Sequence, residues 1–276
     1  MVMSVNTNVG AMIALQNLNA TNAQLATTQS RINTGKSVAN AKDNGAIWAI
    51  AQGQRAEIGA LNAVKQSLDR GVAAVDVALA AGETVSDLLL QMKEKALAAT
   101  DASLTTSARS ALNEDFKALR DQIASVTTNA EFNGINLLET GATGFQALAN
   151  AQGTSTLTVG AEVMALGSTT VSVATTQSIE TLTKATASLT AVSNSIDAVS
   201  GALARLGPKS KALSTHITFV GKLADALESG VGNLVDADLA KESAKLQALQ
   251  TKQQLGVQAL GIANQTPQLV LSLFRS

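Results

Sequence analysis

The segment LTKATASLTAVSNSIDAVSGALARL, residues 182–206, carries the most regular hydrophobic pattern in the chain and decides its fold class. Its apolar positions alternate steps of three and four: Leu182, Ala185, Leu189, Val192, Ile196, Val199, Leu203 and Leu206. This spacing predicts a helix with one narrow apolar stripe, as in a coiled coil. The phase continues past Gly207-Pro208 to Leu227. We therefore expect a kinked but continuous helix, although interior proline costs about 3 kcal/mol.

Two further helices are predicted before this segment. The first runs from about Ala46 to Ala99, and the second carries its stripe on residues 112–126 and ends before Asn129. The polar stretch 101–106 between them offers several helix N-caps.

Residues 130–177 have a different pattern, because glycine and threonine become frequent and the apolar period changes to two. The alternating stretches are 156–159 and 170–173, which predict a β-hairpin or small sheet. The side chains expected to face the helices are Leu157, Val159, Val171 and Val173.

The two ends of the chain lack charge, since residues 1–30 and 253–274 contain no Asp, Glu, Lys or Arg. In the first end, Leu15, Leu18, Leu25 and Ile32 lie in heptad phase, with Asn22 and Gln29 at the remaining seam positions. A closing helix begins near Asp236 and Asp238. An exposed helix normally carries charge on its outer face, so we expect both ends to be surrounded by protein in the working state. Flexible tails are the alternative, but tails usually have low hydrophobicity.

Together these segments predict a mainly α fold: an elongated antiparallel helical coiled-coil rod with a small β-hairpin insert between its N- and C-terminal halves. Residues 1–35 and 237–276 form a terminal coiled-coil domain in this prediction. Residues 36–45 and 229–236 are connectors, and residues 46–228 form a helical rod domain with the insert at about 130–177.

Composition excludes several classes of function. The 276 residues include no Cys and one His, and the net charge is −1. These numbers exclude disulfides, thiolate metal sites, thiol nucleophiles and multi-histidine metal sites, and no basic patch for nucleic acid is present. Asn and Gln interrupt both uncharged ends, so neither predicts a membrane span. No signal-peptide pattern opens the sequence, which favours either a cytoplasmic protein or export by a route without a cleaved signal.

Five motifs, in order along the chain, resemble those of bacterial flagellins of the alphaproteobacterial type, which have a short central variable region. They are residues 5–8, residues 31–36 with 40–44, residues 131–134 with 137–138, residues 236–242, and residues 263–265 with 271–275. The resemblance implies a structural subunit that polymerises into the flagellar filament for swimming motility, with no enzymatic activity and no cofactor. It also implies secretion through the flagellum's own type III channel and a place in the extracellular filament. The implied partners are other flagellin subunits, the export apparatus, a secretion chaperone, and cap and hook-junction proteins.

The uncharged ends suggest how such a subunit assembles. We expect residues 1–35 and 237–276 to be mostly disordered before assembly, because one narrow-stripe helix pair buries too little apolar surface to offset the entropy of ordering. The predicted polymerisation and core-packing positions are Leu15, Leu18, Leu25, Ile32, Leu246, Leu249, Leu260, Val270 and Phe274. An ordinary intramolecular core is the alternative role for these residues. In the first connector, Lys42 and Asp43 are expected either to brace the loop by ion pairs or to form a solvated pair that contributes little to stability.

Other functions remain as alternatives. A hook–filament junction protein shares such terminal helices, but the closing motif favours a filament subunit. A chemoreceptor-like signalling hairpin would lack the uncharged ends and the β insert. An enzyme is disfavoured because the sequence has no phosphate loop, metal-ligand spacing or nucleophile motif.

Overall fold

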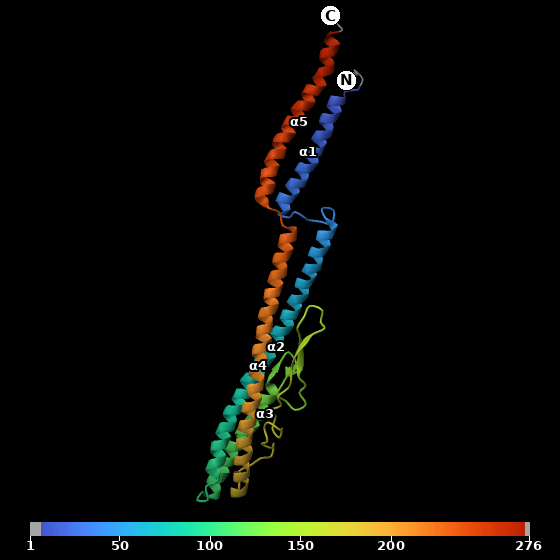
Figure 1. The fold of residues 1–276 in the computed structure, drawn as a ribbon. Helices are drawn as coiled ribbons and strands as arrows, with labels where there is room; N and C mark the ends of the chain where they lie inside the picture. The colour runs from blue at the N-terminus through green and yellow to red at the C-terminus, as the bar shows by residue number, and fades with distance from the viewer. Residues whose placement is uncertain (1–6, 274–276) are drawn as a thin grey trace. The chain divides into compact units, whose positions relative to one another are not determined.

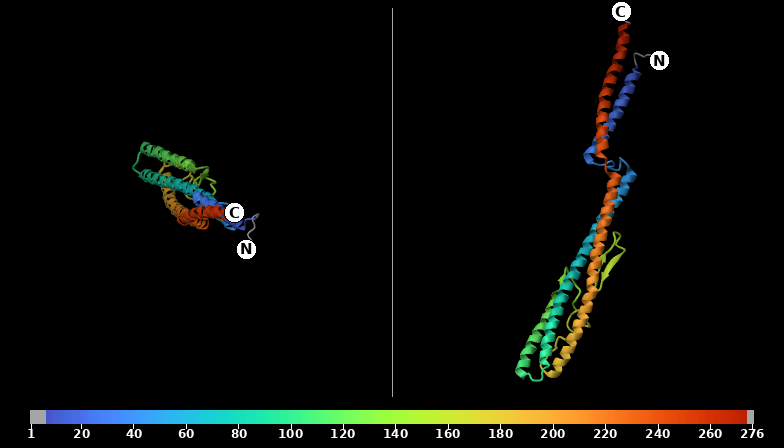
Figure 2. Two further views of the ribbon diagram at one scale, coloured as in Figure 1. Left: turned by 90° about the horizontal axis from the view of Figure 1, so that it is seen from above. Right: turned by 60° about the vertical axis from the view of Figure 1, so that its left-hand side comes forward.

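The chain is mainly α-helical, as predicted. The computed structural model describes residues 7–273, with side chains described as far as residue 265. Its helices are α1 (Val9–Thr34), α2 (Gly45–Ala99), α3 (Thr106–Asn129), α4 (Leu182–Val235) and α5 (Leu239–Leu273), shown in Figures 1 and 2.

The helix ends follow local chemistry. Asn8 caps α1 through a hydrogen bond from the Ala11 amide, and Gly35 ends the helix in the left-handed conformation at φ 68°. Thr105 caps α3 through the Ala108 amide, within the predicted break at 101–106. These are the residue types that helix ends favour.

Helix α4 continues through Pro208, as predicted. Pro208 and the residue four before it, Ala204, are both exposed, so the carbonyl that loses its hydrogen bond lies on the solvent side. The predicted connector at 229–236 is wrong over most of its length, because α4 extends to Val235. Glycine in a helix costs only about 1 kcal/mol, and the burial of Val231 and Val235 favours continuing the helix.

The insert between the helical halves contains two small antiparallel sheets. Strand β1 (Glu131–Phe132) pairs with β2 (Ile135–Asn136), and β3 (Phe145–Leu148) pairs with β4 (Thr156–Val159). The predicted strand at 156–159 is thus confirmed, but its partner is 145–148.

The second predicted strand, 170–173, is wrong. Val171 makes only an isolated bridge to Leu166, and the Ser172 amide donates to the Ser195 hydroxyl on α4. Val171 and Val173 are nevertheless fully buried, as expected. The alternating pattern therefore correctly indicated that one face of this segment is buried. The segment hydrogen-bonds to a side chain of α4, however, and does not pair with a neighbouring strand.

The chain divides into two compact units. We call Met1–Ala56 with Ala226–Ser276 the terminal unit, and Glu57–Asp225 the central unit. Helices α2 and α4 contribute residues to both.

The central unit has a well-packed core. Its fully buried large side chains come from α2, α3, α4 and the insert: Val64, Leu68, Leu89, Met92, Phe116, Ile123, Leu137, Leu138, Met164, Ile179, Leu206 and Leu213. The β3–β4 hairpin packs against α2, because the Phe145 ring lies where a Cβ on Gly71 would be, 2.8 Å from Cε2. On α4, His216 Nε2 bonds the Ala149 carbonyl at the end of β3, at 2.8 Å.

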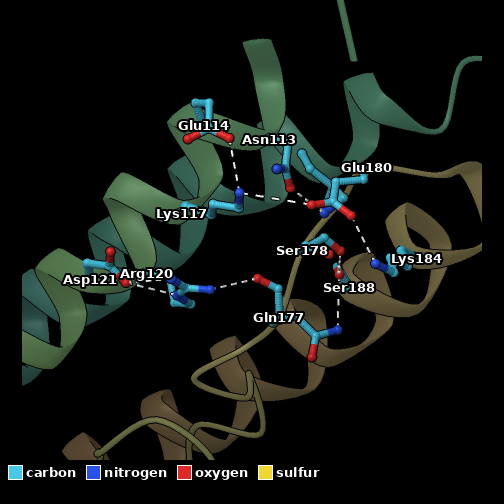
Figure 3. A network of polar contacts seen from close by, with 11 residues as sticks. Asn113, Glu114, Lys117, Arg120, Asp121, Gln177, Ser178, Glu180, Lys184 and Ser188 are labelled. Carbon is cyan, nitrogen blue, oxygen red and sulfur yellow. Dashed lines mark hydrogen bonds and ion pairs between the residues drawn. The ribbon is translucent and has the colours of Figure 1, made fainter. Parts of the chain in front are cut away.

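A polar network joins α3 to the segment that enters α4 (Figure 3). The buried Asn113 side chain accepts a hydrogen bond from the Ile179 amide at 2.8 Å. Nearby, Arg120 donates to the Gln177 carbonyl at 3.0 Å. A hydrogen bond from Lys184, followed by the charges of Lys184 and Lys117, lowers the pKa of the Glu180 carboxyl. The network fixes the start of α4 against α3.

Candidate functional site

The terminal helices α1 and α5 pack as an antiparallel pair, as predicted (Figures 1 and 2). The Asn8 side chain at the start of α1 donates to the Ala263 carbonyl near the end of α5, at 2.7 Å. Farther along, Gln253 donates to the Asn22 side chain, also at 2.7 Å. These contacts join neutral groups, so they give the pair its register without burying a charge.

Most of the predicted packing positions are at least partly buried in the single chain. The half-buried or buried members of the set are Leu18, Leu25, Ile32, Leu246, Leu249 and Leu260. Leu15 is the exception, with 48% of its surface exposed. Val270 lies in α5, where its side chain is not described, and Phe274 lies outside the described residues.

The α1 seam differs from the predicted one at its polar positions. Thr21 and Thr28 are buried there, whereas the predicted Asn22 and Gln29 are exposed. Threonine suits the seam because it is small and can bond to its own helix: the Thr21 hydroxyl donates to the Asn17 carbonyl at 2.9 Å. The Leu18–Leu25 spacing is compatible with a seam residue at either 21 or 22, so periodicity alone could not separate them.

Small residues let the two helices approach closely. A Cβ on Gly256 would lie 3.3 Å from Leu18 Cδ1, and one on Gly10 would lie 3.9 Å from the Ala263 Cβ. Each Gly or Thr that replaces a leucine in the seam reduces the apolar area buried per residue.

The outer face of α1 carries no charge before Arg31, and both helices expose large apolar side chains there, although α5 also exposes Lys241, Lys245 and Lys252. Among the side chains described, as far as residue 265, the large apolar ones that α1 and α5 expose are Val9, Met12, Ile13, Leu15, Leu239, Leu255, Val257 and Ile262. On α1, the exposed apolar residues 9, 12, 13 and 15 lie in the first two turns, outside the seam. Exposed apolar side chains gathered at one place on a helix commonly mark an interaction surface.

An ion pair that the sequence did not predict lies at the connector end of the pair. Arg31 Nη1 is 3.1 Å from Glu242 Oε1, and only 12% of the Glu242 side chain is exposed. The sequence did contain a sign of this pair, because Arg31 is the first charged residue in the chain and Glu242 lies in the first turn of α5. Glu242 Oε2 is buried without a hydrogen-bond partner among the described residues, and so is the Thr28 hydroxyl.

Backbone bonds order the first connector, residues 35–44. The Asp43 carboxylate accepts hydrogen bonds from the Ala39 and Asn40 amides, at 2.9 and 3.1 Å. No ion pair of Lys42 or Asp43 occurs within residues 7–265, so Asp43 braces the connector through backbone amides, in place of the expected ion pairs. The Ser37 amide also bonds the Val235 carbonyl at 2.7 Å, which ties this connector to the end of α4.

The terminal unit differs from the central unit in having little core. None of the fully buried large side chains named above lies in it, and the buried apolar residues among its described side chains are Val38, Ala51, Val231, Val235 and Leu249. The buried side-chain atoms without a hydrogen-bond partner, among those described, belong to Thr28, Gln54 and Glu242, all in this unit. Packing and polar pairing are therefore both incomplete in one copy of the chain.

Within residues 7–273, no helix has the length and apolar character to cross a membrane. The same part of the chain contains no group of His, Asp and Glu side chains arranged to hold a metal ion.

Comparisons with known proteins agree with this architecture. Residues 5–143 match the model of the bacterial flagellin N-terminal helical region, and residues 189–274 match that of the C-terminal helical region. Flagellin FljK of Caulobacter vibrioides is 56% identical over 272 residues, covering 99% of this chain and 98% of that protein. A flagellin of Brucella melitensis is 35% identical over 281 residues, covering 99% of each protein.

A solved structure supports the fold alone. A Vibrio parahaemolyticus protein assigned as flagellar hook-associated superposes with a TM-score of 0.59 at 15% identity, covering 70% of this chain and 100% of that one.

Proposed function

Because the chain belongs to the bacterial flagellin family, we propose that α1 and α5 become fully ordered and buried only when copies of it assemble into a flagellar filament. Flagellins are structural subunits of that filament and not enzymes, so the role of this chain is structural. The proposal concerns how its terminal unit enters the polymer and forms the inner core.

The observation that carries this proposal is the uneven distribution of the core. The central unit buries large side chains completely, whereas the terminal pair has half-buried leucines and exposed apolar outer faces. Ordering a residue costs about 1–2 kcal/mol of backbone entropy, and fully burying a leucine returns about 1.5–3 kcal/mol. A pair with few fully buried leucines therefore gains stability when neighbouring copies cover its outer faces.

The lack of charge over residues 1–30 and 253–274 supports the same inference. Charged groups on the outer faces of α1 and α5 would have to be desolvated inside a polymer, at a cost of several kcal/mol each. Asn and Gln can instead bond between helices, as Gln253 and Asn22 do within one copy. We propose Leu15, exposed in the single chain, as a contact to a neighbouring copy.

The other partners and the location are further parts of the proposal, and they rest on family membership. We propose that the chain passes through the flagellar export apparatus with the help of a secretion chaperone, joins the extracellular filament beneath a cap protein, and meets junction proteins at the hook. A terminal unit with little core of its own suits passage in an unfolded state.

Amide hydrogen exchange on dilute monomer and on seeded filaments tests the mechanism. We expect residues 9–34 and 239–273 to exchange rapidly in monomer and slowly in filaments, while the central core is protected in both. Strong protection of both terminal segments in dilute monomer would contradict the proposal.

A further inference from the structure

The chain contains two Asn-Gly pairs, Asn44-Gly45 and Asn133-Gly134. In such a pair, the glycine backbone nitrogen can attack the side-chain amide carbon of the asparagine, because glycine has no Cβ to hinder the approach. The attack forms an N–Cγ bond and expels the side-chain nitrogen as ammonia. Water then opens the resulting succinimide at either carbonyl, giving aspartate or isoaspartate.

The structure holds the second pair in an unreactive state. Asn133 and Gly134 form the turn between β1 and β2, with φ angles of 51° and 81°. The Gly134 amide donates to the Glu131 carboxylate at 3.0 Å. A nitrogen engaged with an anion loses its proton less readily, so it is a poorer nucleophile.

The first pair, Asn44-Gly45, is accessible to this reaction. Asn44 and Gly45 are both exposed, and a Cβ on Gly45 would meet no atom within 4 Å. Gly45 is the first residue of α2, so its amide has no acceptor in the helix's own ladder. The Asn44 side-chain oxygen accepts a hydrogen bond from the Ile47 amide at 3.2 Å. This bond polarises the carbonyl that is attacked and stabilises the oxyanion that forms on it.

We propose that Asn44 is a site of spontaneous deamidation in the folded protein and that Asn133 is protected. The aspartate product keeps a helix-capping oxygen at the start of α2. In the isoaspartate product, the peptide bond to Gly45 is formed by the side-chain carboxyl group, so the main chain becomes one carbon longer. That change disrupts the bonds from the Ile47 and Trp48 amides to Asn44 and alters the connector.

The test is a time course on full-length monomer at 37 °C and mildly alkaline pH. Trypsin releases residues 43–55 and a glutamate-specific protease releases residues 132–139, so mass spectrometry reads each site separately. We expect Asn44 to react about tenfold faster than Asn133, a factor equivalent to about 1.4 kcal/mol in activation free energy. In strong urea the two rates should become similar, because both pairs are then free.

Two variants complete the test. Gly45→Ala should slow the reaction at Asn44 strongly, and Asn44→Ser should abolish it while keeping a good N-cap. Equal rates at both sites in native protein, or an unchanged rate in Gly45→Ala, would overturn the proposal.

A consequence for assembly rests on the proposed function. Aged wild-type protein should elongate seed filaments more slowly than fresh protein, whereas aged and fresh Asn44→Ser should behave alike. Equal elongation by fully converted and fresh wild-type protein would remove this consequence. If fresh protein failed to elongate seeds, the proposed function itself would fail, while the chemical measurement on monomer would still stand.

Discussion

At the scale of single residues, buried polar groups are paired in one unit and incompletely paired in the other. In the central unit, Asn113 is 1% exposed and receives the Ile179 amide. In the terminal unit, the Thr28 hydroxyl and Glu242 Oε2 are buried without partners among the described atoms. An unpaired buried polar group costs about 1–3 kcal/mol, so the same chemistry stabilises one unit and weakens the other.

Replacing Asn113 by alanine should destabilise the central unit. The Ile179 amide is buried and would lose its acceptor, so we expect the free energy of unfolding to fall by about 1–3 kcal/mol. Urea denaturation followed by circular dichroism measures the change. Asn194→Ala, at an exposed position of α4, is the matched control and should change stability by less than about 0.5 kcal/mol. Equal effects of the two substitutions would show that the Asn113 bond contributes nothing.

Acid should weaken the polar network at the start of α4. The hydrogen bond and charge of Lys184 hold the pKa of Glu180 below its ordinary value of 4.5. A lowered folded-state pKa means that the stabilisation is present above the unfolded pKa and is lost as the pH falls through the folded pKa. We expect a loss of stability below about pH 4.5 that is smaller in Glu180→Gln. Thermal melts of the wild-type and Glu180→Gln proteins between neutral and acidic pH measure this loss. An identical fall in melting temperature with acid for both proteins would contradict the prediction.

At the scale of elements, the sequence predicted what local patterning encodes. The long helix expected over 46–99 occurs as Gly45–Ala99, because its stripe, its start and the break after it are all local signals. The expected pairing of 156–159 with 170–173 did not occur, since alternation reveals a buried face but not the partner strand. The helical end of α4 was also missed, because glycines near residue 230 indicate a break only when nothing buried holds the helix together.

The candidate site was predicted less completely, for a related reason. The leucines of the α1–α5 seam follow from spacing, but whether position 21 or 22 joins them depends on how closely α5 approaches. That distance is set by Gly256 and Ala263, more than 200 residues away. The Arg31–Glu242 pair likewise depends on the antiparallel register.

A charge on the outer face of α1 should block assembly without affecting the folded monomer. Leu15 is 48% exposed, so Leu15→Asp removes little buried surface in one copy. In a filament, the new carboxylate would be desolvated without a partner, at a cost of several kcal/mol. We expect seeded elongation to be nearly abolished, with an unchanged melting curve for the central unit. Leu15→Met is the conservative control and should elongate normally; normal growth by Leu15→Asp would exclude this face from the interface.

At the scale of the whole chain, the two units divide stability and assembly between them. The central unit carries the buried core and so can fold in a single copy. Among the described residues, the terminal unit holds the uncharged segments, most of the exposed large apolar side chains and the unpaired buried atoms, all of which favour association. Under the proposed mechanism, such a subunit would polymerise only at existing filament ends, because a template there provides the missing neighbours.

Limited proteolysis tests this division directly. Trypsin sites in the terminal unit include Arg31, Lys36, Lys42, Arg55, Lys241, Lys245 and Lys252. In dilute monomer we expect cleavage there within minutes, leaving a resistant fragment that contains residues 57–225, because cleavage requires local opening and the terminal unit has little core to prevent it.

In filaments the same bonds should resist trypsin, since neighbouring copies would cover them. The trimmed fragment should retain a cooperative thermal transition but fail to elongate seeds. Cleavage of monomer first within residues 57–225, or growth of long stable filaments from the trimmed fragment, would show that the terminal helices do not depend on assembly for their order and that assembly does not depend on them.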